Sequence, residues 1–374
     1  MNRILKAFLS GDMRIWIPLL LIVVPSLINF IRGKAVRKRK LPSLSFYPEI
    51  AVIVEVRSAD ERLYSCLRSI ANSVYPIGRV VVYLVACRKE ESELKELMHC
   101  QRSFPYLRIQ LVNECADRET ALRSALHSAN GKYIFHMDSN GEPEAKAFRN
   151  MVALFEGDES LDCLTGAVLT KPSSISRKKL FPRLLAELEF LEHAGGFLSG
   201  HHPVREFEAV YRMDGAFSAV RKTAEAKSMA YIRKCSEPGN AGLRPKERVM
   251  ICEEALLLTE PEEAEKEGFA RFDRNYGLPR LIWTAALLVT LIFGSSPAVF
   301  IETLLVLYLY TVLRELVRAV VICRKLKAHP SLRRYYRRRL PGILLMPFGR
   351  VIGRVLRLHT YMLQAENAGK ELTS

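Results

Sequence analysis

The stretch GKYIFHMDSNGEP, residues 131–143, decides the fold because it sets acidic residues directly behind a short apolar strand. The YIFHM segment has the composition of a buried strand, and Asp138, Asn140 and Glu142 are predicted on the turn that leaves it. Oxygen ligands at such a turn suit Mg²⁺ or Mn²⁺, which usually also binds substrate phosphates. The alternative is a polar turn that caps a helix beginning near Glu144.

Upstream of this turn, β-branched runs alternate with helical patterns. The predicted strands are 50–56, 79–86, 108–112 and 133–137, and the predicted helices are 61–73, 92–100 and 119–129. The alternation predicts an α/β fold with a mostly parallel, Rossmann-like sheet and helices on both faces. Ligands of such sheets bind at the carboxyl ends of the strands, where Arg57, Cys87 and Asp138 would meet.

The formal net charge of +16 comes from two short segments of the 374-residue chain. Residues 32–40 carry six basic residues and residues 324–357 carry eleven, with no Asp or Glu in either segment. The rest of the chain is therefore close to neutral. Because each basic segment follows a strongly apolar one, the charge predicts contact with anionic lipid head groups and not with nucleic acid.

Two apolar segments are predicted to lie in a membrane. Residues 15–31 hold no charge and lack a small-residue cleavage site, which favours a retained anchor over a removed signal peptide. Residues 281–313 hold one charge, Glu302, and are interrupted by GSSP at 294–297, which predicts a helical hairpin. The Lys and Arg excess marks the cytoplasmic side. The prediction is a multi-pass plasma-membrane protein whose main domain is cytoplasmic.

The tail after the hairpin has a helical pattern of its own. Arg350, Arg354 and Arg357 recur among Ile, Val and Leu, which predicts an amphipathic helix in the membrane interface. The predicted organisation is a membrane anchor with its basic segment at 1–40, an α/β domain at 41–277, a transmembrane hairpin at 278–323 and a basic interfacial tail at 324–374.

The eight cysteines show no paired short spacing and no His at metal-ligand distance. In a cytoplasmic domain they are predicted to be reduced thiols, many of them small core residues, without a catalytic or zinc-binding role.

Several segments carry, in their order, a resemblance to a known family. They are AVIVEVRSADERLYSCLRSIANSVYP, TALRSALHSANGKYIFHMDSNGEPEAKAFRNMVALF, LDCLTGAV, MDGAFSAVRK and GFARFDRNYG. Over residues 48–277 this order resembles the membrane-bound family 2 glycosyltransferases that build extracellular polysaccharides. The resemblance implies a GT-A fold, a nucleotide-sugar donor, and Mg²⁺ or Mn²⁺ as cofactor.

The family's functional positions are only partly matched. The resemblance implies donor-binding roles for Arg57, Asp60, Asp138, Arg271 and Arg274, and a metal held by Asp138 and Asn140. The family's Asp-x-Asp is Asp-Ser-Asn here, so the second ligand is uncharged. The acidic residue that follows the opening strand stands one position late, at Asp60, and the carboxylate that should end the second strand is missing. The Gln-x-x-Arg-Trp signature keeps neither its Gln nor its Trp.

The general base of the family is the Asp of a Glu-Asp pair, and no such pair occurs in the corresponding region. Glu237, followed by Pro238, and Glu254, which follows Glu253, are the remaining candidates. An inverting transfer needs a carboxylate to take the proton of the acceptor hydroxyl, and losing it costs about 10²–10⁴-fold in rate.

Two functions are compatible with these departures. The first is a catalytically impaired membrane glycosyltransferase-like protein, a pseudoenzyme that acts with an active membrane glycosyltransferase in cell-surface or extracellular polysaccharide biosynthesis. The alternative is a divergent active enzyme that moves a sugar from a nucleotide-sugar to a lipid-linked or growing glycan. Asp138 and Asn140 would then hold the metal, with Glu237 or Glu254 as base.

Overall fold

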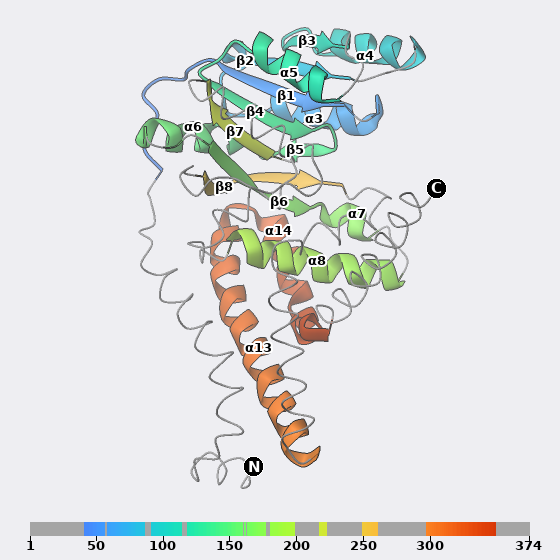
Figure 1. The fold of residues 1–374 in the computed structure, drawn as a ribbon, viewed down its shortest axis with the longest axis vertical. Coiled ribbons are helices and arrows are strands. Elements are labelled where there is room, and N and C mark those ends of the chain that lie inside the picture. Colours follow the sequence, from blue (N-terminus) through green and yellow to red (C-terminus); the bar gives the residue numbers. More distant parts are fainter. Residues whose placement is uncertain are drawn as a thin grey trace, which may run out of the picture. The chain divides into compact units, whose positions relative to one another are not determined.

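The chain forms two compact units, which we call the sheet unit and the helical unit (Figure 1). The sheet unit comprises Arg37–Lys171 and Val204–Glu260, and the helical unit comprises Met1–Val36, Pro172–Pro203 and Pro261–Ser374. The computed structural model describes residues 41–56, 58–86, 91–113, 118–159, 161, 163–176, 180–198, 217–222, 249–260 and 297–348. The segment Pro172–Pro203, which the predicted 41–277 domain includes, groups with the helical unit.

An eight-stranded sheet in the order β3-β2-β1-β4-β7-β6-β8-β5 forms the centre of the sheet unit. The strands are β1 (Ile50–Glu55), β2 (Val80–Val85), β3 (Arg108–Val112), β4 (Tyr133–Asp138), β5 (Gly141–Pro143), β6 (Cys163–Thr170), β7 (Phe217–Arg221) and β8 (Val249–Thr259). The first four strands in this order pair in parallel, as predicted. The later half mixes directions, because β7 runs antiparallel to β4 and β6, and β5 runs antiparallel to β8.

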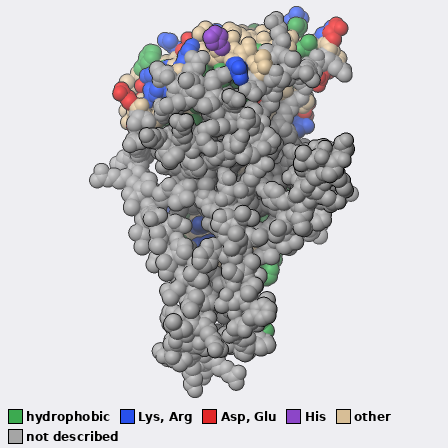
Figure 2. Space-filling model, in the orientation of Figure 1, with side chains coloured by type: hydrophobic (Ala, Val, Ile, Leu, Met, Phe, Trp, Pro, Cys, Tyr) green, Lys and Arg blue, Asp and Glu red, His purple; other side chains and the backbone are tan. Residues whose placement is uncertain are grey.

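Helices alternate with the strands as the sequence predicts. The sheet unit contains α3 (Glu61–Ala71), the 3₁₀ turn η1 (Ile77–Arg79), α4 (Glu91–Ser103), α5 (Arg118–Ser128) and α6 (Ala147–Gly157). Each predicted strand and helix of this region is present, with ends that differ by at most three residues. On the face seen in Figure 2, the described surface carries Lys and Arg side chains interspersed with Asp and Glu.

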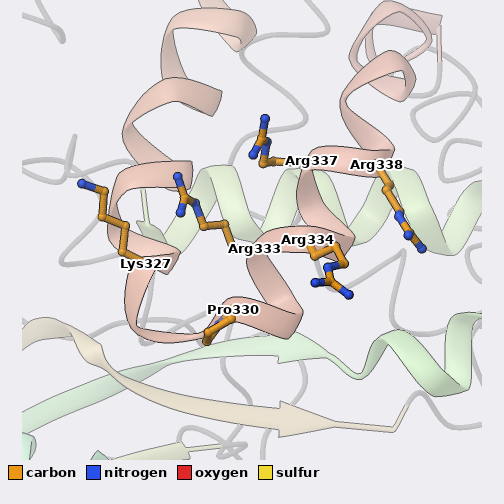
Figure 3. A pocket seen from close by; sticks show the side chains of 6 residues that line it. All are labelled: Lys327, Pro330, Arg333, Arg334, Arg337 and Arg338. Atoms are coloured by element: carbon orange, nitrogen blue, oxygen red, sulfur yellow. The ribbon is translucent and has the colours of Figure 1, made fainter.

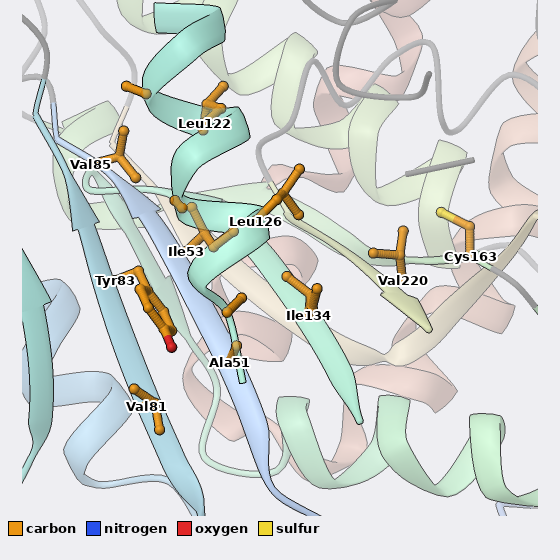
Figure 4. Close-up of a cluster of buried hydrophobic side chains, with 13 residues drawn as sticks. Ala51, Ile53, Val81, Tyr83, Val85, Leu122, Leu126, Ile134, Cys163 and Val220 are labelled. Atoms are coloured by element: carbon orange, nitrogen blue, oxygen red, sulfur yellow. The ribbon is translucent and has the colours of Figure 1, made fainter. Parts of the chain in front are cut away.

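The core lies on both faces of the sheet. On one face, α5 packs Leu122 and Leu126 against Ile53, Tyr83 and Ile134 of three neighbouring strands (Figure 4). On the other face, the ring of Phe148 in α6 contacts the rings of Phe135 and Phe217, with centroids 5.0 and 6.2 Å away. The period-2 alternation along β4 sends Ile134 to the first face and Phe135 to the second.

The described part of the helical unit consists of two long helices and several short helical segments. It contains α7 (Pro172–Ser176), α8 (Leu180–Leu198), α13 (Pro297–Lys325), η3 (Leu326–Ala328), α14 (Pro330–Arg339) and η4 (Leu340–Leu344). Helix α8 packs against α13, α14 and η4, and the ring of Phe190 meets that of Tyr335 at 5.1 Å. Helix α13 begins at the Pro297 break predicted from the sequence and continues past the end of the apolar segment at 313, to Lys325, two residues beyond the predicted hairpin boundary at 323.

The predicted membrane segments are described only in part. The anchor at 15–31 and the first arm of the hairpin lie outside the described residues. Among the helices that the structure describes, none combines the length and the apolar character needed to cross a bilayer.

The packing of Gly166 yields a stability prediction. A Cβ at Gly166, beside the irregularity between β6 and β8, would lie 2.2 Å from Cδ1 of Phe217 and 2.7 Å from the carbonyl oxygen of Ala255. Because both neighbours are held in the core, we expect Gly166→Ala to lower the free energy of unfolding by about 1–3 kcal/mol.

The measurement is thermal and urea unfolding of the full chain. Gly78→Ala is the matched control, since a Cβ there has no neighbour within 4 Å. Equal stability of the two variants would contradict the packing argument.

Candidate functional site

The carboxyl ends of β1 and β4 bring three titratable side chains to one face of the sheet. Glu55 and Asp138 are paired in register as the last residues of their strands. His136 lies two residues before Asp138 and therefore on the same face. Its Nε2 lies 3.5 Å from Oε2 of Glu55, and neither ring nitrogen has a hydrogen-bond partner. His136 and Asp138 are 8% and 7% exposed, so this is a nearly buried polar cluster.

The corner after β4 is held by the backbone on both sides. The amide of Ser139 donates to the carbonyl of Glu55 at 3.0 Å, and Nδ2 of Asn140 donates to the carbonyl of Glu260 at 3.3 Å. The amide of Glu260 in turn donates to the carbonyl of Asn140 at 3.4 Å. The position of Asn140 therefore depends on the end of β8 as well as on β4.

An ion-pair network lies beside this corner. Lys171, the residue after β6, contacts the carboxylate of Glu142, and its Nζ lies 3.5 Å from Oε1 of Glu260. The Lys171 side chain is only 16% exposed. Glu142, predicted on a turn, instead lies in β5 and is engaged by a lysine. Sequence reasoning missed Lys171, because its contacts with Glu142 and Glu260 join segments that are distant in sequence.

The corner presents oxygen atoms that fit a hard divalent cation. Oδ1 of Asn140 is buried and has no hydrogen-bond partner, and Asp138 supplies a carboxylate two residues earlier. An amide oxygen and a carboxylate are ligands that Mg²⁺ or Mn²⁺ accepts, with water or substrate phosphates completing the shell. The described residues contain no group of three or more His, Cys, Asp or Glu side chains arranged to hold a metal. Asp138 and Asn140 therefore supply two oxygen ligands, and their predicted role in holding a metal stays a prediction.

Asp60 caps a helix and forms hydrogen bonds with two neighbouring residues. It is the N-cap of α3: Oδ1 accepts from the Arg62 amide at 3.0 Å, and Oδ2 accepts from Oγ of Ser58 at 2.8 Å and from Nε of Arg62 at 2.9 Å. Partial burial raises the pKa of this carboxyl, but the hydrogen bonds from Ser58 and Arg62 outweigh it, so the pKa is lowered overall. This geometry shows that Asp60 caps α3. Its predicted donor-binding role stays a prediction.

Glu254 lies apart from the corner. It is exposed in β8, near the register shift against β6, and its carbonyl accepts from Nδ2 of Asn150 at 2.7 Å. Glu260, beside Asn140, is six residues further along, a span of roughly 20 Å in extended chain. The structure does not bring Glu254 to Asn140. The other predicted site residues, Arg57, Glu237, Arg271 and Arg274, lie outside the described residues.

The four described cysteines of the sheet unit have the character of core residues. Cys66, Cys100, Cys163 and Cys252 are buried free thiols, as predicted. Burial raises the pKa of Cys100 to about 11, and burial together with the charges of Glu142 and Asp138 raises that of Cys66 further. Such thiols are poor nucleophiles at neutral pH.

Fold and corner together define a class of protein. The mixed sheet, with helices on its faces and an acidic corner after β4, is consistent with the GT-A fold. The chain belongs to the family described as "Glycosyltransferase like family 2", whose model matches residues 48–234. None of the curated proteins matches the chain.

Solved structures give distant likenesses. The mannosyltransferase PcManGT from Pyrobaculum calidifontis, in complex with GDP-Man and Mn²⁺, is 15% identical with a TM-score of 0.49, over 93% of this chain and 98% of that chain. Residues 1–349 of S. aureus TarS are 13% identical with a TM-score of 0.39, over 84% and 91%. Glucosyl-3-phosphoglycerate synthase from Mycobacterium tuberculosis is 11% identical with a TM-score of 0.36, over 60% and 75%. Family membership rests on the family model.

The two roles of Asp60 make different predictions. As a helix cap, Asp60→Ala should lower the free energy of unfolding by about 1 kcal/mol, and Asp60→Asn by less. Because the folded-state pKa is below the ordinary 3.8, the charge stabilises the fold above that pH. The stability difference between wild type and Asp60→Asn should therefore shrink as the pH falls through the folded-state pKa.

Urea unfolding between pH 7 and pH 3 measures this difference, and nucleotide titration of the same variants provides the comparison. Unchanged stability with weakened nucleotide binding would assign Asp60 to the donor and not to the cap.

Proposed function

We propose that this family 2 glycosyltransferase-like chain is a membrane-associated protein of cell-surface or extracellular polysaccharide biosynthesis, catalytically impaired and acting with an active membrane glycosyltransferase. The observation that carries the proposal is the composition of the corner after β4. It combines one carboxylate, Asp138, with the neutral amide of Asn140, whose Nδ2 is already bonded to a carbonyl. A bound Mg²⁺ or Mn²⁺ would neutralise the leaving phosphates of a nucleotide-sugar. A site with one carboxylate holds such an ion more weakly than the two carboxylates of the family's Asp-x-Asp.

The carboxylates near the donor edge support the same proposal. Asp60 is engaged as the cap of α3, and Glu142 is engaged by Lys171. Glu55, at the end of β1, lies beside His136. A carboxylate held by a cation or a helix terminus is less available to bind a nucleotide or to take a proton. These groups therefore favour a role in structure over a role in turnover.

The divergent active enzyme is the second candidate, and one observation favours it. Oδ1 of Asn140 is a buried acceptor without a donor, which is costly in a folded protein unless a ligand completes it. In that case Asp138 and Asn140 would hold the metal of a nucleotide-sugar, and Glu237 or Glu254 would act as base. The membrane anchor, the hairpin and the cytoplasmic placement of the main domain belong to both candidates.

Calorimetric titration of the detergent-purified chain with UDP and with GDP, each with and without Mn²⁺, tests the proposal. For an impaired site we expect no metal-dependent binding up to millimolar nucleotide. Asn140→Asp should then create it, because the second carboxylate strengthens the site for the cation. Asp138→Asn in the Asn140→Asp background should abolish it again.

The matched control is Glu159→Gln, which removes one exposed negative charge elsewhere in the sheet unit. Metal-dependent binding by the wild type that Asp138→Asn abolishes would establish the active candidate. Nucleotide binding that needs neither the metal nor Asp138 would contradict both.

A further inference from the structure

The helical unit contains an open cavity of about 500 Å³ at the junction of η3 and α14. Apart from one proline, its lining is entirely cationic, and Figure 3 shows Arg334 and Arg338 together on one side of α14 with Lys327 and Arg333 on the other. The lining residues are Lys327, Pro330, Arg333, Arg334, Arg337 and Arg338. We call the lysine and the four arginines the cavity cations.

Within the described part of the chain, the cavity cations have no carboxylate partner, whereas nearby arginines do. Glu315, which is 4% exposed, accepts from Arg314 and from Arg318 at 3.0 Å each. Glu187 lies 3.0 Å from Arg339, the last residue of α14. Among the residues that the structure describes, no carboxylate pairs with any cavity cation. An anionic ligand would supply the negative charge that these contacts lack.

The buried Nε atom of one cavity cation also indicates an anionic ligand. Nε of Arg333 is buried and has no hydrogen-bond acceptor. An oxyanion placed among these groups would accept charge-assisted hydrogen bonds from planar guanidinium groups, for which phosphate has the matching geometry.

An apolar stripe runs along α13 toward the cavity. Its residues recur every three or four positions and are 44–65% exposed: Ile301, Leu305, Leu309, Leu313, Leu316, Val317 and Val320. The stripe spans about 29 Å of helix. On the surface of a soluble protein, a continuous exposed apolar stripe of this kind is uncommon. Such stripes mark surfaces that contact protein or lipid.

Along the chain, the apolar stripe of α13 is followed by cations. This order matches the acyl chains and the phosphate of a lipid. The stripe ends at Val320, and the next cations are Arg324, Lys325 and Lys327. The two arginines within the length of the stripe, Arg314 and Arg318, both form ion pairs with Glu315. A helix in lipid needs such pairing along the acyl chains, whereas cations beyond the apolar part can meet the lipid phosphates.

Exposed apolar residues of the η4 region extend the same surface. Leu344 and Phe348 are 50% and 58% exposed. Tyr308 connects them to α13, because its hydroxyl donates to the carbonyl of Leu344 at 3.0 Å and its ring lies 5.6 Å from that of Phe348.

We propose that the cavity at η3 and α14 is a binding site for the phosphate of an anionic membrane lipid, whose acyl chains lie along the apolar stripe of α13. A soluble phosphate would use the cavity cations but would leave the stripe uncovered. A nucleic acid would likewise gain nothing from the stripe. The site is independent of the donor corner, so it stands whether or not the chain catalyses sugar transfer.

The test is titration of the full chain, in neutral detergent, with dioctanoyl-phosphatidylglycerol. Dioctanoyl-phosphatidylcholine has the same chains and no net charge, and inorganic pyrophosphate has charge and no chains. Saturable binding of the phosphatidylglycerol and none of the phosphatidylcholine is expected. Arg334→Gln with Arg338→Gln should weaken it by about ten-fold or more, since each cation near an anionic head group contributes about five-fold.

Matched variants separate the site from net charge. Arg68→Gln with Arg102→Gln removes two exposed cations of the sheet unit and should leave lipid binding unchanged. Arg334→Lys with Arg338→Lys keeps the charge and should retain most of it. Leu309→Ser with Leu313→Ser should weaken binding of the lipid but not that of pyrophosphate.

Equal phosphatidylglycerol binding by the Arg→Gln variant and the wild type would overturn the proposal. Pyrophosphate binding tighter than lipid binding, unaffected by the Leu→Ser changes, would assign the cavity to a soluble phosphate compound. Preferential binding of a single-stranded oligonucleotide would assign it to nucleic acid. Calorimetry with UDP on the same sample reports on the donor corner separately.

Discussion

The in-register parallel pairing of β1 with β4 is the constraint on which the candidate site depends. It places Glu55 opposite Asp138 and lets the amide of Ser139 bond to the carbonyl of Glu55, so that the chain turns out of the sheet at that point. A slip by one residue would move the Asp138 carboxylate to the aromatic face, where an uncompensated charge is costly. Gly131 allows the close start of β4, since a Cβ there would lie 2.8 Å from the amide nitrogen of Ala51.

Charged side chains are paired to different extents in the two units. In the sheet unit, Glu142 contacts Lys171, and Asp60 caps α3 and pairs with Arg62. Among the described residues of the helical unit, Glu315 pairs with Arg314 and Arg318 and Glu187 pairs with Arg339, whereas four other arginines line an open cavity. Because desolvating an unpaired charge is unfavourable, the protein leaves such charges only where water or an anion can reach them.

Local patterns predicted much of the fold and part of the site. The predicted strands and helices between residues 50 and 138 match the structure to within three residues, because side-chain periodicity and turn residues act locally. Asp138 falls at a strand end for the same reason. The antiparallel half of the sheet was not predicted, since the pairing of β5 with β8 joins segments that are distant in sequence.

The sequence by itself determined the alternation of strands and helices, the Asp-Ser-Asn corner and the concentration of positive charge after α13. Only the tertiary structure decided which charges are neutralised, because that depends on contacts between distant elements. Lys171 reaches Glu142, and His136 approaches Glu55, through strand pairing. Glu187 of α8 reaches Arg339 of α14 but no cavity cation. Sequence alone specifies the charged groups, whereas packing specifies which of them remain for a ligand.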